Sequence, residues 1–151
     1  MAITVSTTAF DSVLERRPGL HVWTARGFVS RSVCGFDLFV EASSDDAAIL
    51  DRISSELTWW GTDGPEASLS IALTSDGASV PLLLAASGTS VDQGAGAISA
   101  RVSIEFPSPR GTEMVLTTAS ESWRHSASVA LNAADLARAL TDWETSVGAR
   151  D

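Results

Sequence analysis

The sequence offers few side chains that do chemistry. Its 151 residues include two histidines (His21 and His125), one cysteine (Cys34), no lysine and no tyrosine, so all ten basic side chains are arginines. This composition excludes a Schiff-base lysine, the lysine of a phosphate-binding loop, and a tyrosine acid or base. Any site must therefore use histidine, arginine, carboxylate, hydroxyl or indole groups.

The two histidines do not form a motif. His125 shares the apolar face of a predicted strand with Trp123 and Val129, which indicates a buried, hydrogen-bonded histidine. His21 alternates with apolar neighbours, so it faces solvent or a groove. A metal site would need both strands side by side together with a carboxylate, and no spacing supports one.

No catalytic motif is present. The sequence lacks a G-x-S-x-G elbow, an H-E-x-x-H zinc motif, an EF-hand loop and a phosphate loop. The acid pairs Asp45–Asp46 and Asp63–Glu66 lie at a predicted helix start and in a turn, where solvated acids are common. A Ser-His-Asp triad is defined by geometry, which residue counts cannot supply. We expect no catalytic set, no metal and no cofactor.

Cys34 lies in the apolar run 33–36, which predicts a buried thiol. A single cysteine forms neither an internal disulfide nor a zinc site of ordinary composition. Whether this thiol reacts depends on a cationic neighbour, and Arg31 is close in sequence.

Tryptophans are stronger candidates for binding. Trp60 and Trp143 lie on the apolar faces of two predicted helices, so we expect them in the core. Trp59 points about 100° away from Trp60 and lies at or outside the margin of that face. Two interpretations stay open for Trp59: an interface anchor, or packing under the following loop, which contains Asp63.

A second group of polar and aromatic side chains belongs to the later strands and is suited to contacts with a small molecule. Together with Trp59 and Asp63, these are the candidate binding residues: Arg101, Trp123, Arg124 and His125.

The first predicted helix covers about residues 45–60. Ser44 is its expected N-cap, and Glu56 falls away from its apolar face. That face repeats at spacings of four, four and three: Ile49, Ile53, Leu57 and Trp60.

The second predicted helix covers about residues 133–147. Asn132 is its expected N-cap, and Asp135 follows in an imperfect capping box. Its apolar face repeats at spacings of four, three and four: Leu136, Leu140, Trp143 and Val147.

Alternation of apolar and polar residues predicts the strands. Asp76-Gly77 between two alternating runs predicts a type I′ hairpin, and Pro81 places its strand at an edge or distorts it. We expect a bulge or bend at Gly35 and a flexible loop over 88–96. The expected strands are 3–5, 20–24, 28–42, 69–74, 80–84, 98–106, 113–119 and 123–131.

The order of strands, helix, strands and helix is typical of an α+β fold. We predict one curved antiparallel sheet of about six strands packed by two helices. Without a linker or an internal repeat, residues 1–151 are expected to form a single domain.

One segment carries a family resemblance. The helix end and turn Leu57-Thr58-Trp59-Trp60-Gly61-Thr62-Asp63-Gly64, followed by alternating strands and a capped helix, resembles a family of small actinobacterial proteins. That family has a W-x-x-W-x-G-like helix end, whereas the two tryptophans are adjacent here. The resemblance covers the element order over about 45–147. It supports the fold and implies no site, since the family has no established activity.

The net charge of the chain indicates which classes of partner it can bind. Nineteen acids against ten arginines give a net charge of −9, which argues against nucleic acid. No apolar run approaches about 18 residues, and no signal peptide is visible, so we expect no membrane segment and a cytoplasmic location.

Two classes of function stay open. The sequence is similar to bacterial immunity or antitoxin-like proteins in being small, acidic and without a catalytic set, which favours a non-enzymatic module that covers a basic protein partner. The alternative is a small-molecule-binding protein or accessory enzyme with a pocket between sheet and helices. Self-association is a further expectation, if the strand of Pro81 or the corner at Trp59 is buried between copies.

Overall fold

The computed structural model of the chain describes residues 4–59, 69–92, 94–108, 113–121 and 123–148. In chain order its elements are β1 (Val5–Thr7), β2 (Ser12–Arg17), β3 (Leu20–Val29), β4 (Val33–Ser43), α1 (Ala47–Trp59), β5 (Ser70–Ser75), β6 (Ala78–Val80), β7 (Leu83–Asp92), β8 (Ala97–Pro107), β9 (Met114–Ser120), β10 (His125–Leu131) and α2 (Ala133–Gly148).

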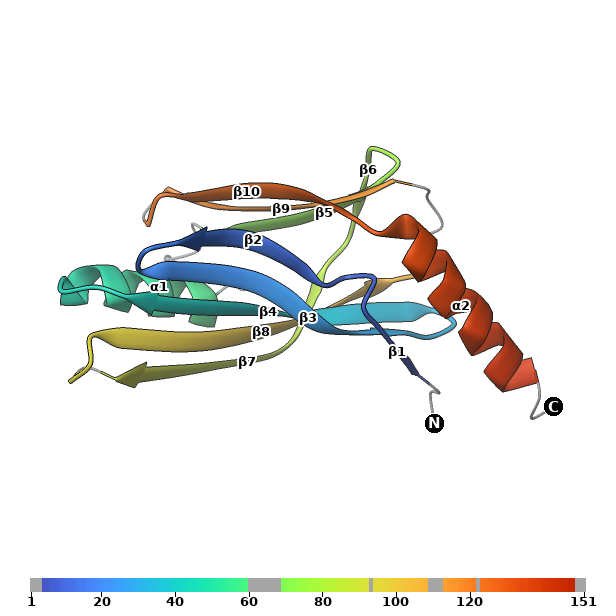
Figure 1. Ribbon diagram of the computed structural model, residues 1–151, viewed down its shortest axis with the longest axis horizontal. Coiled ribbons are helices and arrows are strands. Elements are labelled where there is room, and N and C mark those ends of the chain that lie inside the picture. Colours follow the sequence, from blue (N-terminus) through green and yellow to red (C-terminus); the bar gives the residue numbers. More distant parts are fainter. Residues whose placement is uncertain (1–3, 60–68, 93, 109–112, 122, 149–151) are drawn as a thin grey trace.

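The strands form two antiparallel sheets. The first sheet has six strands in the order β1-β3-β4-β8-β7, with β2 also paired to β3, and the second has four in the order β10-β9-β5-β6. Figure 1 shows them as two layers. The predicted α+β fold with antiparallel strands and two helices is confirmed, but the single curved sheet is wrong. Pro81 and Leu82 lie outside both strands, so the chain leaves the second sheet after β6 and joins the first at β7.

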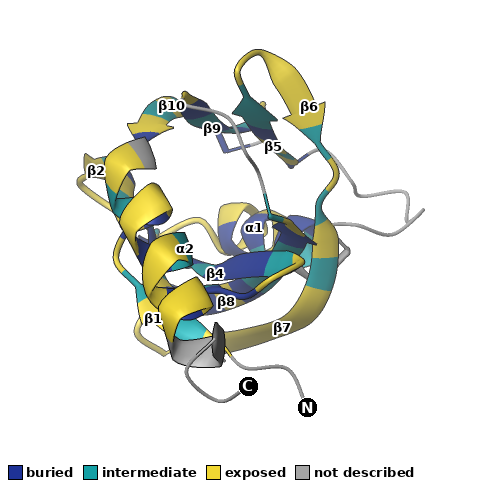
Figure 2. Cartoon of the chain, turned by 90° about the vertical axis from the view of Figure 1, so that its right-hand side faces the viewer, coloured by how far each residue is buried: buried dark blue, intermediate teal, exposed yellow. Residues whose placement is uncertain are grey.

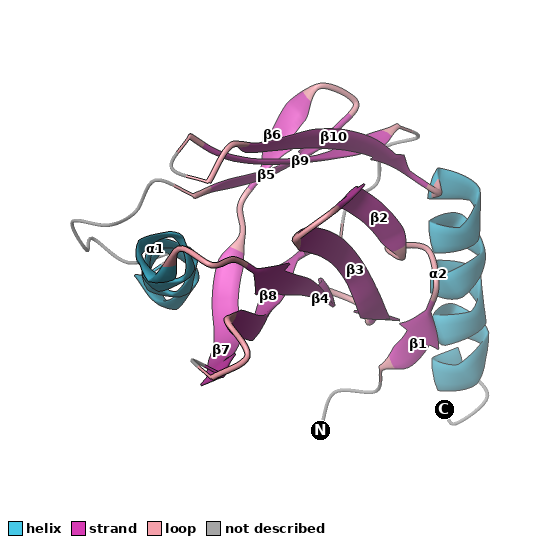
Figure 3. Ribbon diagram, turned by 60° about the vertical axis from the view of Figure 1, so that its left-hand side comes forward, coloured by secondary structure: helices cyan, strands magenta, loops and turns pink. Residues whose placement is uncertain are grey.

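The helices occupy different ends of the molecule (Figure 3). Helix α1 packs against β7 and β8 of the first sheet, and its Glu56 accepts a hydrogen bond from Ser120 of β9 in the second. It therefore lies between the two layers, as Figure 2 shows. Helix α2 packs against β1 and β3. No helix among the described residues is long and apolar enough to cross a membrane.

Helix α1 begins two residues later than predicted, and its cap is different. The Asp46 Oδ1 atom accepts a hydrogen bond from the Ala48 amide at 3.0 Å, while Ser44 Oγ accepts one from the Asp46 amide. Asp46 is therefore the N-cap, and the prediction of Ser44 is wrong.

The buried face of α1 is also rotated from the predicted one. Ile49 is 41% exposed, whereas Leu50 and Glu56 are buried beside Ile53 and Leu57. Glu56 was expected away from this face, and its burial is made possible by the hydroxyl of Ser120. Sequence periodicity missed this arrangement because it counts only apolar residues. Trp60, the last residue of the predicted face, lies outside the described part of the chain.

Helix α2 agrees with its sequence signals. Asn132 Oδ1 accepts a hydrogen bond from the Asp135 amide at 3.0 Å, which confirms the N-cap. Leu136 and Trp143 are buried, as expected for its apolar face.

The turn between β5 and β6 confirms the hairpin prediction. Asp76 and Gly77 both have positive φ, 50° and 83°, and Ser75 pairs directly with Ala78. These angles define a two-residue type I′ turn.

Two other predictions for the strands are wrong. Residues 88–92 are not a loop but the second half of β7, where Thr89 pairs with Ala100 of β8. The irregularity expected at Gly35 lies on β3 instead, between Ala25 and Phe28. Gly35 keeps regular register, and its role is to leave room for the Phe28 ring, whose Cε1 would be 2.5 Å from an added Cβ.

We predict that Gly77→Ala destabilises the fold and that Gly88→Ala does not. An added Cβ meets nothing within 4 Å at either position, but only Gly77 has a positive φ. Placing a side chain in the left-handed region costs about 1–2 kcal/mol. Urea denaturation should show a lower free energy of unfolding for Gly77→Ala alone. Equal values for the two variants would contradict the type I′ turn.

Candidate functional site

The turn between β2 and β3 connects the two sheets through Arg17. Its Nη1 atom donates to Glu15 Oε2 at 3.0 Å and to the carbonyl oxygen of Arg124 at 2.9 Å. Its Nη2 atom donates to the carbonyl oxygen of Trp123 at 3.0 Å. One guanidinium on the first sheet thus holds the β9–β10 turn of the second.

His125 lies at the centre of a buried polar chain beneath this turn. Its Nδ1 atom is hydrogen-bonded to Glu15 Oε1, and its Nε2 atom lies 2.6 Å from Thr118 Oγ1. Because an ionised carboxylate only accepts hydrogen bonds, Nδ1 is the nitrogen that donates to Glu15. The Trp123 ring stacks on the imidazole, with centroids 5.1 Å apart. The predicted buried, hydrogen-bonded histidine is confirmed.

The hydroxyl of Thr118, the imidazole of His125 and the carboxylate of Glu15 are hydrogen-bonded in the order of a nucleophilic triad. Thr118 is 0% exposed and His125 is 2% exposed. A nucleophile must approach the substrate to about 3 Å, and an enclosed hydroxyl cannot do so. We therefore interpret Glu15, His125 and Thr118 as a structural relay that satisfies buried polar groups.

A cleft lies between α1 and the β9–β10 turn, next to the relay. We call it the helix cleft. Its volume is about 550 Å³, within the range typical of ligand sites. It is lined by Arg17, Pro18, Gly19, Leu20, Ala42, Ser43, Ser44, Ile49, Leu50, Ile53, Trp123 and Arg124.

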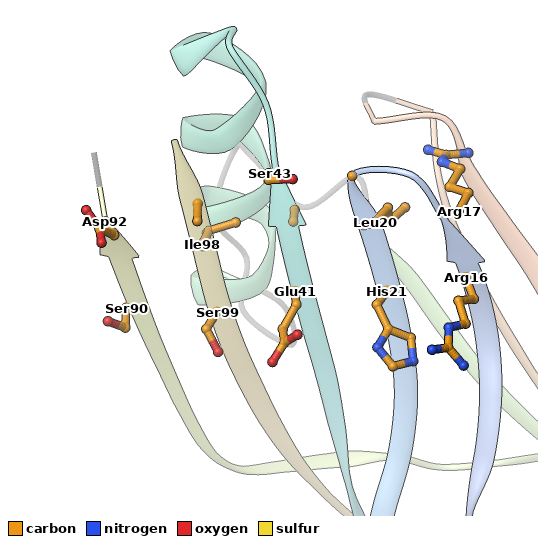
Figure 4. Close-up of a pocket in the computed structure, with 13 residues that line it drawn as sticks. Arg16, Arg17, Leu20, His21, Glu41, Ser43, Ser90, Asp92, Ile98 and Ser99 are labelled. Carbon is orange, nitrogen blue, oxygen red and sulfur yellow. The ribbon is translucent and has the colours of Figure 1, made fainter. Parts of the chain in front are cut away.

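A second hollow, the end groove, lies on the other side of the β2–β3 turn and measures about 490 Å³. Figure 4 shows its polar side chains in a row across the first sheet. The strand register explains the row, because each residue is the direct cross-strand partner of the next: Arg16, His21, Glu41, Ser99 and Ser90. His21 therefore faces a groove, as predicted.

The outer face of the first sheet carries a column of aromatic rings. His21 stacks on Trp23 with centroids 4.2 Å apart, and Trp23 stacks on Phe39 at 5.2 Å. Arg26 caps the column, its Cζ atom 5.6 Å from the centre of the Phe39 ring. We call this the aromatic face; its residues are Val13, His21, Trp23, Arg26, Phe39 and Arg101.

The candidate binding residues predicted from the sequence do not all lie together in the structure. Trp123, Arg124 and His125 lie together at the β9–β10 turn, and the first two line the helix cleft. Arg101 lies apart from them, exposed on β8 opposite Phe39. Trp59 ends α1, but its side chain is not among those described. Asp63 lies outside the described residues.

Sequence reasoning missed the partners that hold this site. Glu15 and Arg17 fall in a stretch without clear alternation, because the register between β2 and β3 shifts between Val13 and Glu15. The burial of Thr118 could have been predicted, because Thr118 falls on the same strand face as the buried Leu116. A buried threonine on an apolar strand face points to a polar partner.

Two pKa shifts accompany partial or full burial. Burial raises the pKa of the Cys34 thiol, an effect partly offset by its hydrogen bonds with the Ser108 side chain and the Ser30 backbone. The predicted buried cysteine is confirmed. Loss of solvent also raises the pKa of Asp11, which lines a third hollow beside α2.

No group of three or more histidine, cysteine or acidic side chains in the described ranges could hold a metal ion. Comparisons with protein-family models, with curated proteins and with solved structures found no match to this chain.

We predict that Thr118→Val lowers the free energy of unfolding by about 1–3 kcal/mol, because it leaves His125 Nε2 buried without a partner. Thr117→Val is the matched control. Thr117 faces outward and its hydroxyl meets only Ser128 at the surface, so its loss should change stability by less than about 0.5 kcal/mol. Chemical denaturation distinguishes them, and equal effects would contradict the relay.

Proposed function

We propose that this chain is a non-enzymatic protein-binding module, of the immunity or antitoxin-like kind, that binds a basic protein through its aromatic face. The observation that carries the proposal is the stacked column of His21, Trp23 and Phe39, which are only partly buried on the outer face of the first sheet. Tryptophan and arginine supply a large share of the binding energy at protein interfaces.

The other sheet offers a contrast. Its outward residues are small, for example Ala72, Thr117 and Ser128, and they include no aromatic ring among those described. On the aromatic face, Val13 is 54% exposed and stands opposite Trp23. Stacked aromatic rings are thus present on the outer face of the first sheet and absent from the described outward residues of the second.

Charge supports a basic partner. The outer face of the first sheet carries arginines, such as Arg16 and Arg101, and acids, such as Asp37 and Glu41, so this face does not by itself select a partner by net charge. The whole chain carries −9, which attracts a cationic protein from a distance and speeds association at low salt. The aromatic face would supply the binding affinity. The long-range electrostatic field of the negative net charge would select a basic partner.

Self-association would use a different surface. Strand β7 is one edge of the first sheet, is exposed along most of its length (Figure 2), and carries no charged residue before Asp92. An uncharged edge is where two acidic copies could pair, since edge strands are usually protected by charges. Neither the Pro81 segment nor the Trp59 corner is needed for this pairing.

The proposal is tested by affinity capture from an extract of the source cells. Wild type should capture one basic protein in stoichiometric amount, and Trp23→Ala with Phe39→Ala should weaken its Kd by about thirtyfold, which corresponds to about 2 kcal/mol. Val115→Ala with Thr117→Ala, on the other sheet's outer face, is the matched control and should bind as wild type does. The association rate should fall as salt rises.

Equal capture by all three proteins would contradict the aromatic face as the binding surface. Capture of further copies of this chain alone would contradict a basic partner and assign the contact to β7. Circular dichroism shows whether each variant is folded.

A further inference from the structure

The helix cleft has a charge opposite to that of the molecule. Two arginines, Arg17 and Arg124, line it, and none of its described lining residues is acidic, although the chain has nineteen acids and ten arginines. Arg17 is ion-paired with Glu15, so Arg124 supplies the positive charge of the cleft that has no acidic partner among the described residues. Such a site favours an anion over a cation or a neutral molecule.

The two arginines have different roles. The guanidinium of Arg17 donates hydrogen bonds to Glu15 and to the carbonyl oxygens of Trp123 and Arg124. Arg124 has a φ of 53°, a left-handed conformation that is costly for a residue other than glycine. The hydrogen bond from Arg17 to its carbonyl oxygen holds it there. No described residue is hydrogen-bonded or ion-paired to the Arg124 side chain, so its guanidinium is available to a ligand.

Trp123 contributes a second donor. It lines the cleft and is 5% exposed, and its Nε1 atom is the one buried side-chain polar atom without a hydrogen-bond partner among the described residues. Buried N–H groups are nearly always paired, and an unpaired one calls for an explanation. A ligand oxygen that reaches this atom from the cleft would supply the missing acceptor.

The wall opposite these donors is apolar. Helix α1 contributes Ile49, Leu50 and Ile53, and the first sheet contributes Leu20 and Ala42. Ile49 is exposed although it belongs to an apolar repeat, because α1 turns Leu50 inward in its place. A ligand with an apolar tail would cover it.

We propose that the helix cleft binds a small amphipathic carboxylate, with its carboxylate on Arg124 and Trp123 and its tail on Ile49 and the apolar wall of α1. This site is separate from the aromatic face, so either proposal can fail without the other. Binding is non-covalent and involves no chemical step.

Octanoate is the probe, and octylammonium and octanol are its matched controls. Calorimetric titration of the full chain should give saturable binding of octanoate with one site, and binding at least tenfold weaker for both controls. From butanoate to octanoate, affinity should rise about fourfold for each methylene that the cleft buries. Equal binding of octanoate and octylammonium, or no octanoate binding, would overturn the proposal.

Arg124→Gln should weaken octanoate binding at least tenfold, because it replaces the charge-assisted bond with a neutral one. Arg31→Gln, which removes an exposed arginine outside the cleft and outside the aromatic face, is the control and should leave the affinity unchanged. A weakening shared by both variants would mean that octanoate responds only to the overall charge, and this too would overturn the proposal.

The indole N–H signals report the second donor directly. The chain has five tryptophans, and the Trp123 signal is assigned by its loss in Trp123→Phe. Octanoate should shift that signal in a ¹H–¹⁵N spectrum at the concentration that saturates calorimetric binding. Binding without a shift at Trp123 would remove this residue from the site and contradict the proposed pose.

Discussion

The hydrogen bonds from β2 to the β9–β10 turn are the constraint on which the rest of this structure depends. The two sheets have separate strand ladders, and Glu15 and Arg17 reach from one to the other. Glu15 fixes the His125 ring, and Arg17 fixes the carbonyl oxygens of the turn. Buried polar groups of this kind are costly when unpaired, so they restrict how the layers can sit.

This junction also shapes the surface. Arg17 donates a hydrogen bond to the carbonyl oxygen of Arg124, a left-handed residue whose side chain lines the helix cleft, and α1 supplies the cleft's apolar wall. The same β2–β3 turn separates the helix cleft from the end groove, and the aromatic face begins at His21 just beyond it. A structural relay, a cleft and a candidate interface are thus positioned by one short turn.

Local signals predicted local structure well. The Asn132 cap, the Asp76-Gly77 turn and the buried His125 follow from rules that involve only neighbouring residues. The division into two sheets was not predictable from alternation, because alternation does not say which strand pairs with which. For the same reason, the sequence could not show that Arg101 and Arg124 lie on different surfaces. The burial of Glu56 was also not predictable from its own helix, because it depends on a hydrogen bond from Ser120 in another element.

The claim that Glu15 and His125 join the two sheets is tested most directly by a double-mutant cycle. Glu15→Ala, His125→Ala and the double variant are unfolded in urea, and the coupling energy is taken from the four free energies of unfolding. We predict a favourable coupling of at least about 1 kcal/mol, as expected for residues that share one hydrogen-bond network. A coupling indistinguishable from zero would contradict the account, because the two side chains would then contribute independently to stability.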